Sequence, residues 1–398
     1  MLLPSMRGFR GGKNHFRILY TEHMKVLITG GAGFIGTHLS RYLLGLGHNV
    51  TVLDNFSPQI HSGRTELADD LKSHVRLLRG DVADPSSMAL ALEQAECVIH
   101  LAAETGTGQS MYEVARYERT NLGGTALLYD LITKSKAPRL ERVVVASSRA
   151  IYGEGAYHCP EHGLVYPLPR CSADKKAGHF DPVCPHCGMA CETVPTPESA
   201  PLRPTSFYGL TKQVEEQTVL LFGNVLGIPS FALRYQNVYG PGQSLNNPYT
   251  GILAIFSNLA RAGQPIHIFE DGQESRDFVY VEDVVRATAA CIRPEIKGCE
   301  AVNVGSNNRT SVLTVANEIN RFFGNHSAVN VTGAFREGDI RHGMADLNRS
   351  RNLLKYEPSW KFTDGLHSFL TWTIENELPE NLYEKSLDEM KQRGLLRE

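Results

Sequence analysis

The chain has no long hydrophobic run and no excess of basic residues. Its 40 Lys and Arg stand against 43 Asp and Glu in 398 residues, which gives no positive field for nucleic acid. No apolar stretch approaches the about 20 residues that a membrane-spanning helix needs. Residues 1–23 lack the apolar segment and small-residue cleavage site of a secretory signal. We therefore expect a soluble, cytoplasmic protein that binds neither nucleic acid nor membrane, with residues 1–23 as a disordered extension.

A glycine-rich turn follows the first strand pattern. Residues 26–28 are typical of a buried parallel strand, and a helix is expected over 37–46. Gly30 would permit the tight turn, Gly33 would let a phosphate approach the backbone, and Gly36 would let the helix pack closely on the strand. Because the first amides of a helix lack intrahelical partners and lie at its positive end, this turn, with Phe34 and Ile35, is a candidate pyrophosphate site.

An acidic residue follows the second strand pattern, which covers residues 49–53. The carboxylate of Asp54 can accept both ribose hydroxyls of a dinucleotide and would repel a 2′-phosphate. Three spaced glycines also occur at plain corners between a strand and a helix. The flanking strand, the helix and the spaced acid favour a dinucleotide site, and they predict NAD rather than NADP, with Asn55 beside the acid.

Strand and helix patterns alternate after this turn. Strands are expected over 75–82, 97–103 and 142–148, and helices over 85–95 and 117–134. This order predicts an α/β fold with a doubly wound parallel (Rossmann) sheet, in which ligands lie at the carboxyl ends of the strands. The residues expected to border that crevice are Asp81, Val82, Leu101, Ala102, Ala103, Ser147 and Ser148. Asp81 would reach the adenine side, or it would only form a Gly-Asp turn.

A tyrosine and a lysine lie four residues apart at positions 208 and 212. On the helix expected over 208–226 they project from the same face. An ammonium group beside a phenol stabilises the phenolate, which would make Tyr208 a general base. The same spacing occurs in ordinary amphipathic helices. The dinucleotide site upstream and Ser148, which would hydrogen-bond the same substrate oxygen, favour a catalytic role for Tyr208 and Lys212.

Together these motifs resemble the extended short-chain dehydrogenase/reductases that act on nucleotide sugars. The resemblance covers residues 24 to about 378 and also rests on Asn121, on the segments 151–153 and 233–241, and on the segment 276–279. It implies that the N-terminal sheet holds NAD, with Asn121 and Tyr235 contributing. It further implies that a smaller C-terminal domain holds a dTDP- or UDP-linked sugar.

The resemblance also assigns residues to this nucleoside diphosphate sugar. Ser148, Arg149 and Asn237 would contact the sugar or its diphosphate, Arg276 the diphosphate, and Arg336 with Asp339 the nucleotide end. An arginine fork matches phosphate oxygens in a bidentate way. Arg276 could instead form a surface ion pair with Asp277 or Glu274, and the run 336–341 also fits a solvated charged turn.

The resemblance divides the chain into parts. The expected NAD-binding domain covers residues 24–153 and 201–235, with a return around 277–295. An insertion covers 154–200, and the nucleotide-sugar-binding domain covers 236–276 and 296–398. A homodimer formed by the helices over 117–134 and 208–226 of each subunit is implied as well.

The residues after Ser148 reduce the number of reactions that the resemblance allows. Relatives that eliminate water across C5 and C6 carry an Asp-Glu pair where this chain has Arg149 and Ala150, and ketoreductases usually use NADPH, which Asp54 argues against. The remaining reaction is 4-epimerisation through a 4-keto sugar, with tightly held NAD. The chain most resembles members that act on a dTDP-linked deoxysugar. The alternatives are a UDP-sugar 4-epimerase and a 4-ketoreductase.

The insertion departs from the family pattern. It holds five of the eight cysteines, at positions 159, 171, 184, 187 and 191. Cys159 with His162, and Cys184 with Cys187, form two hooks typical of a zinc ribbon, and a Cys3His shell leaves no position for water. The sequence predicts a structural zinc site, in which Cys171, Cys191, His158, His179 or His186 could substitute as ligands. A disulfide of Cys171 or Cys191 is the alternative, which a cytosolic location disfavours.

A non-enzymatic alternative combines a redox-sensing NAD module with a zinc ribbon that docks nucleic acid or protein. Tyr208, Lys212 and Ser148 argue against it, because a sensor needs no activated phenol. The insertion also lacks a dense basic cluster, and its cations Arg170, Lys175 and Lys176 are expected to form a solvated face.

Overall fold

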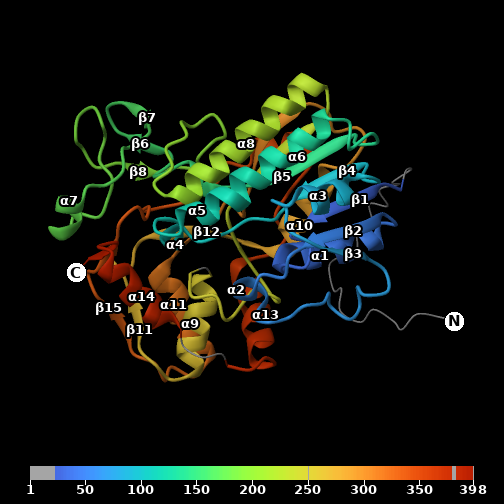
Figure 1. The fold of residues 1–398 in the computed structure, drawn as a ribbon. Helices are drawn as coiled ribbons and strands as arrows, with labels where there is room; N and C mark the ends of the chain where they lie inside the picture. Colours follow the sequence, from blue (N-terminus) through green and yellow to red (C-terminus); the bar gives the residue numbers. More distant parts are fainter. Residues whose placement is uncertain (1–22, 250, 379–381, 398) are drawn as a thin grey trace.

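The computed structural model describes residues 23–249, 251–378 and 382–397 (Figure 1). The extension expected over residues 1–23 therefore lies outside the described residues, except for its last residue. Within these ranges no helix has the length and apolar character needed to cross a membrane.

A seven-stranded parallel sheet forms the centre of the fold (Figure 1). Its order is β13-β9-β5-β4-β1-β2-β3, and every neighbouring pair runs parallel. Val26 and Ile28 contact one hydrophobic core and Leu27 contacts another, so the strands are buried on both faces. The predicted doubly wound α/β sheet is thus confirmed. The strands are β1 (Lys25–Thr29), β2 (Asn49–Asp54), β3 (Arg76–Arg79), β4 (Cys97–His100), β5 (Arg142–Ser148), β9 (Ser230–Tyr235) and β13 (Cys299–Val304).

Helices cover both faces of this sheet. On one face α1 (Phe34–Gly45) packs against α10 (Val281–Ala290). On the other face lie α3 (Pro85–Leu92), α6 (Gly124–Thr133) and α8 (Phe207–Leu226). Both cores are formed by alternate residues of the same strands, which fixes the register of each strand relative to its helices.

The helix expected over 117–134 forms without a break, but its first half includes a π-helical segment that the sequence analysis did not predict. Before α6 the chain forms α5 (Val114–Tyr117) and a π-helix, η1 (Glu118–Gly123). The wider turn presents Asn121, whose amide donates to the Glu104 carbonyl at 3.2 Å and to Thr211 Oγ1 at 2.9 Å. Its oxygen accepts the Glu104 N–H at 2.8 Å. Asn121 therefore ties the loop after β4 to α8.

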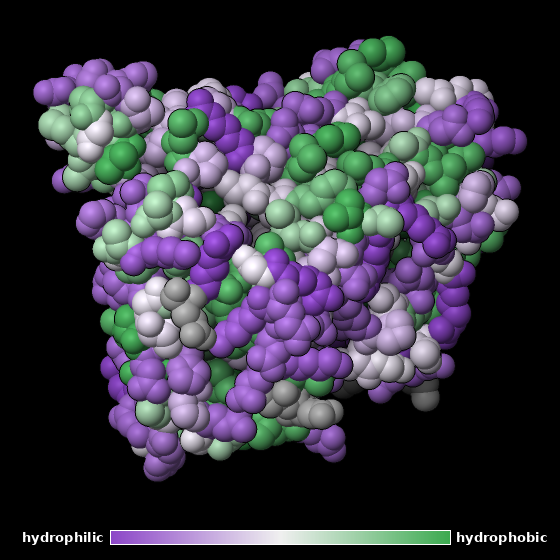
Figure 2. All heavy atoms as spheres, turned by 60° about the vertical axis from the view of Figure 1, so that its left-hand side comes forward, coloured by the Kyte–Doolittle hydropathy of each residue, from purple (hydrophilic) through white to green (hydrophobic). Residues whose placement is uncertain are grey.

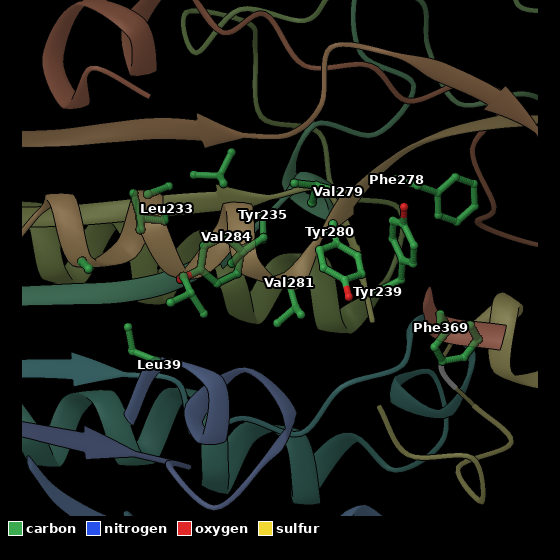
Figure 3. Close-up of a cluster of buried hydrophobic side chains, with 14 of the residues drawn as sticks. Leu39, Leu233, Tyr235, Tyr239, Phe278, Val279, Tyr280, Val281, Val284 and Phe369 are labelled. Atoms are coloured by element: carbon green, nitrogen blue, oxygen red, sulfur yellow. The ribbon is translucent and has the colours of Figure 1, made fainter. Parts of the chain in front are cut away.

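A smaller unit follows at the carboxyl ends of the parallel strands. Figure 3 shows buried side chains that run from Leu233 and Tyr235 of β9, past Val284 of α10, to Tyr239 and Phe369 of the smaller unit. One core thus joins the two parts, and the predicted domain bounds stay a prediction.

The strands of the smaller unit are β10 (Asn237–Tyr239), β11 (Ile266–Ile268), β12 (Ser275–Tyr280), β14 (Arg309–Ser311), β15 (Val329–Val331), β16 (Phe335–Arg336) and β17 (Leu396–Arg397). Its helices are α9 (Ile252–Arg261), α11 (Val312–Phe322), α12 (Asn348–Leu354), α13 (Phe362–Ile374) and α14 (Tyr383–Gln392).

The insertion folds outside the central sheet, at the upper left of Figure 1. Three short antiparallel strands, β6 (Tyr157–Cys159), β7 (Gly163–Val165) and β8 (Glu192–Thr193), pair in the order β7-β6-β8, and α7 covers Ser172–Lys176. The solvated face expected of its cations is wrong for two of the three. The Arg170 and Lys175 side chains are 4% and 1% exposed, because each pairs with buried or half-buried carboxylates, whereas Lys176 is exposed.

Candidate active site

The glycine turn after β1 has the geometry of an anion-binding site. Gly30 has a φ of +66°, and a Cβ there would lie 2.8 Å from the backbone of Ala102, so a side chain does not fit. A Cβ on Gly36 would lie 2.5 Å from Gly31 Cα. Helix α1 begins at Phe34, three residues before its expected start at residue 37, and its N-cap Gly33 provides no side-chain cap. The first amides of α1 are therefore available to a phosphate.

A cavity of about 450 Å³ lies at the carboxyl ends of the parallel strands. It brings together most of the residues expected from the sequence to bind cofactor or substrate. Those that line it are Gly30, Gly33, Phe34, Ile35, Gly36, Asp54, Asn55, Val82, Leu101, Ala102, Ala103, Ser147, Ser148, Arg149, Tyr208, Lys212, Tyr235 and Asn237. Asp81, Asn121, Arg276, Arg336 and Asp339 do not line this cavity.

Asp54 ends β2 at the edge of the cavity and is 5% exposed. Its two carboxylate oxygens accept the backbone N–H groups of Ala32 at 3.0 Å and Phe56 at 2.9 Å. His61 Nε2 lies 3.1 Å from the same carboxylate. Asp81 supports this edge indirectly, since its carboxylate accepts the Asn55 amide at 3.2 Å and the Ala83 N–H at 2.8 Å. The carboxylates thus hold the two loops that would flank an adenosine ribose.

Ser148, Tyr208 and Lys212 come to the same cavity from two elements. Ser148 is the last residue of β5, and its Oγ accepts the Ala150 N–H at 3.1 Å at the start of the 3-10 helix η2 (Arg149–Ile151). Tyr208 lies in the first turn of α8, which Ser206 caps by accepting the Gly209 N–H at 3.1 Å. Lys212 follows one turn later.

Gly209, which the sequence analysis did not single out, permits the approach of these elements. A Cβ at this position would lie 2.6 Å from the Ala150 carbonyl oxygen, so α8 begins in direct backbone contact with η2. The Tyr208 N–H also donates to Ser110 Oγ at 3.0 Å, and Ser110 ends α4 (Thr107–Ser110). The sequence signal that could have predicted this close contact is the glycine directly after the candidate catalytic tyrosine.

Lys212 has a buried carboxylate partner that the sequence analysis also missed. Its Nζ lies 2.7 Å from Glu215 Oε2, and both side chains are at most 3% exposed. Burial raises the pKa of Glu215, against the effect of the Lys212 ammonium. His100, fully buried in β4, is bonded through Nδ1 to Thr29 Oγ1 at 2.7 Å, and burial, together with the Lys212 charge, lowers its pKa to about 3. His100 is therefore a neutral core histidine.

Two further polar side chains, Arg149 and Asn237, line the cavity. Arg149 Nε donates to Asn237 Oδ1 at 2.8 Å, which joins η2 to β10. Burial and the neighbouring Arg276 guanidinium lower the pKa of Arg149 to about 10. The Arg149 and Arg276 guanidiniums therefore lie close enough to influence each other.

Arg276, Arg336 and Asp339 form a cluster beside the cavity. Arg276 Nη2 donates to Asp339 Oδ1 at 3.0 Å, and Arg336 Nε lies 3.6 Å from Asp339 Oδ2. Although burial raises it, the guanidiniums of Arg336, Arg276 and Arg149 together lower the pKa of Asp339 to about 2. The alternative surface pair of Arg276 with Asp277 or Glu274 is wrong, because Arg276 is 6% exposed and pairs with Asp339.

The alternative of a solvated turn is wrong for Arg341, which is 2% exposed. Its guanidinium contacts Asp181, Glu270 and Asp271. Arg341 thus reaches partners far away in the sequence, whereas Arg336 lies beside Asp339 of the same segment.

The four predicted metal ligands gather in the insertion. The ligand atoms of Cys159, His162, Cys184 and Cys187 all lie within 4.8 Å of one another. The Cys159 sulfur is 3.7 Å from both His162 Nδ1 and the Cys187 sulfur, and Cys184 is 3.7 Å from His162 Nδ1. Gly163 and Gly188, each directly after the second ligand of a hook, have φ values of +66° and +74°. In the structure all eight cysteines are free, with no disulfide at Cys171 or Cys191.

Comparison with known proteins assigns the chain to one family. The model of the NAD dependent epimerase/dehydratase family matches residues 26–179 and 186–305. The chain belongs to this family. A dTDP-L-rhamnose 4-epimerase of Burkholderia thailandensis is 40% identical over 350 residues, which cover 87% of this chain and 94% of the relative.

Solved structures agree with this assignment. The UDP-glucose 4-epimerase of Thermotoga maritima with UDP-glucose has a TM-score of 0.70 at 28% identity, covering 88% of this chain and 99% of that chain. MoeE5 in complex with UDP-glucose and NAD has a TM-score of 0.68 at 28% identity, with the same coverage. As a member of the NAD-dependent epimerase/dehydratase family the chain is an enzyme, which argues against the NAD-sensing regulator.

Proposed function

We propose that the chain is a nucleotide-sugar 4-epimerase with tightly bound NAD, which interconverts dTDP-L-rhamnose and dTDP-6-deoxy-L-talose. The observation that carries this proposal is the convergence of Ser148, Tyr208 and Lys212 on the cavity that begins at the glycine turn. The sugar is proposed from the 40% identity to a dTDP-L-rhamnose 4-epimerase and from Arg149 and Ala150, which replace the Asp-Glu pair of the dehydratases.

The residues at the cavity fit NAD. The uncapped start of α1 would hold the pyrophosphate, and Asp54 would face the adenosine ribose. When bound, NAD would supply hydride transfer at C4 of the sugar.

The chain's own residues would move one proton in each direction. Ser148 would hold O4 of the sugar by a hydrogen bond, and the Tyr208 phenolate would take the proton from the 4-hydroxyl. The ammonium of Lys212 would stabilise that phenolate. After the 4-keto sugar turns in the cavity, Tyr208 would return the proton to O4. Arg149 and Asn237 would orient the substrate beside its diphosphate.

The test follows the sugar by NMR. Purified protein is incubated with dTDP-L-rhamnose and separately with UDP-galactose, with and without added NAD. Conversion of dTDP-L-rhamnose to its C4 epimer, abolished by Tyr208→Phe, is the expected result. Conversion of UDP-galactose alone would favour the UDP-sugar 4-epimerase. Turnover only with NADPH and a keto sugar would favour the ketoreductase and refute the epimerase.

We also propose a structural zinc ion in the insertion, held by Cys159, His162, Cys184 and Cys187. Ligands about 2.0–2.3 Å from a tetrahedral zinc lie about 3.3–3.8 Å apart, which agrees with the 3.7 Å separations of the ligand atoms. Metal analysis should find one zinc per chain, lost in Cys184→Ser and retained in Cys171→Ser, which alters an exposed cysteine of the same insertion. Zinc retained by Cys184→Ser would contradict this ligand set.

A homodimer is the proposed assembly. Leu210, Val214, Leu221 and Val225 of α8 are 37–70% exposed. On the face drawn in Figure 2, hydrophobic side chains gather in the upper part, at the height of α8 in Figure 1. Light scattering should give twice the 44.0 kDa mass of the chain, and the mass should halve in Leu221→Glu.

A further inference from the structure

The insertion contacts the segment 335–342 at successive residues. Lys175 Nζ lies 3.0 Å from Glu337 Oε2 and 3.5 Å from the Arg336 carbonyl oxygen. The same ammonium lies 4.5 Å from the centre of the Phe335 ring. Ser172 Oγ donates to the second Glu337 oxygen at 2.5 Å. These contacts hold the first half of the segment from α7.

Arg170 holds the second half. Its Nη2 donates to the Asp339 carbonyl oxygen at 2.9 Å, while its Nε donates to Glu154 at 2.9 Å and its Nη1 to Glu270 at 2.8 Å. Glu154 in turn accepts the Arg341 N–H at 2.8 Å. Arg170 is thus a buried crosslink between the insertion, the loop before β12 and the backbone of Asp339.

The side chains of Arg336 and Asp339 reach another partner. The backbone carbonyl of Asp339 contacts Arg170, and that of Arg336 contacts Lys175. The side chain of Asp339 instead pairs with Arg276 at 3.0 Å, and the side chain of Arg336 lies 3.6 Å from Asp339. The insertion therefore fixes the backbone of the residues whose side chains form the cluster expected at the diphosphate and nucleotide.

We infer that the insertion is a positioning element for nucleotide recognition, in which Arg170 and Lys175 set the place of Arg336 and Asp339. This inference rests on the proposed function, because it takes a nucleoside diphosphate sugar as the ligand. Arg170 and Lys175 are positioning residues, since they act through the segment 335–342. The glycine turn and the Ser148, Tyr208 and Lys212 group receive no contact from either residue among those the structure describes.

The test compares Lys175→Met and Arg170→Lys with the matched control Lys176→Met, which alters the exposed neighbour. Lys175→Met keeps the side-chain length and removes the ammonium. Arg170→Lys keeps the charge and loses most of the hydrogen bonds of the fork. Equilibrium binding of free dTDP and of NAD is measured by calorimetry, with circular dichroism and thermal melting as folding controls. KM and kcat follow from the epimerase assay.

We expect the dissociation constant for dTDP and the KM of the sugar nucleotide to rise at least tenfold in both variants. NAD affinity and kcat should stay within about threefold of wild type, and Lys176→Met should match wild type. Unchanged dTDP binding in folded variants would overturn the inference while leaving the epimerase intact. A parallel loss of NAD binding, kcat and melting temperature would also overturn it, because that pattern indicates general destabilisation. Wild-type protein that binds no dTDP would refute the substrate class first, and the inference with it.

Discussion

Glu274→Gln should remove a pH-dependent loss of stability. Glu274 directly precedes β12, is 7% exposed, and its Oε2 has no hydrogen-bond partner among the described residues. Burial is the main cause that raises its pKa to about 7; Arg276 opposes it, while Glu270 and Asp339 add to it.

The sign follows from proton binding. The pKa of the Glu274 carboxyl is about 7 in the folded protein, against an ordinary value of 4.5. At pH values between these two, the folded protein holds the Glu274 proton more tightly than the unfolded chain does. Stability therefore falls as pH rises through this window and is constant above it. A difference from 4.5 to about 7 corresponds to about 3 kcal/mol at about 1.4 kcal/mol per pH unit. A neutral glutamine avoids that cost.

Urea unfolding followed by fluorescence measures the effect. At pH 5 Glu274→Gln should be more stable than wild type by less than about 1 kcal/mol, and at pH 8 it should be more stable by about 3 kcal/mol. The control Glu375→Gln, at an exposed position after α13, should show no such pH-dependent difference. Equal stability at pH 8, or a larger gain at pH 5, would refute the reasoning.

Three further changes test the site and its support. Gly209→Ala places a Cβ 2.6 Å from the Ala150 carbonyl oxygen, and the displaced Tyr208 should lower kcat about 100-fold; the control Gly45→Ala, in open space on α1, should keep full activity, and a fully active Gly209→Ala would contradict the close contact. Glu215→Gln removes the carboxylate 2.7 Å from Lys212, so the ammonium should stabilise a phenolate better and the acidic limb of the kcat/KM profile should move to lower pH; a shift to higher pH would reverse our account. Glu216→Ala breaks a pair with Arg234 at 2.5 Å in which both side chains are at most 5% exposed, and chemical denaturation should show a loss of about 3–5 kcal/mol; a loss below about 1 kcal/mol would mean that Arg234 finds another partner.

Local patterns predicted the central sheet, the glycine turn and the grouping of cavity residues. Each depends on residues close in the sequence, such as the alternation of apolar residues in β1 or the four-residue spacing of Tyr208 and Lys212. The π-helix η1 could not be predicted in this way. Its wider turn is accompanied by contacts of Asn121 with Thr211, 90 residues away.

Sequence patterns also failed to predict which charged side chains are buried. Arg170 and Lys175 look like surface cations in the sequence, but their partners Glu270 and Glu337 lie 100 and 162 residues away. Composition shows that a charge is present and not which carboxylate will neutralise it. The four candidate metal ligands could be predicted, because the two ligands of each hook are close in the sequence. Only the meeting of the two hooks depends on the fold.

The insertion lies between Ser148 and Tyr208 in the chain, and this order affects how the two residues of the proposed catalytic group come together during folding. The Arg203 N–H donates to the Ile151 carbonyl oxygen at 2.9 Å, which closes the excursion at its base. Bringing two distant residues together costs loop entropy that grows with the logarithm of the intervening length, about 0.6 kcal/mol for each doubling. An insertion that folds locally shortens the effective loop, so Ser148 and Tyr208, the proposed catalytic residues, meet across a short stem rather than across a long unstructured chain.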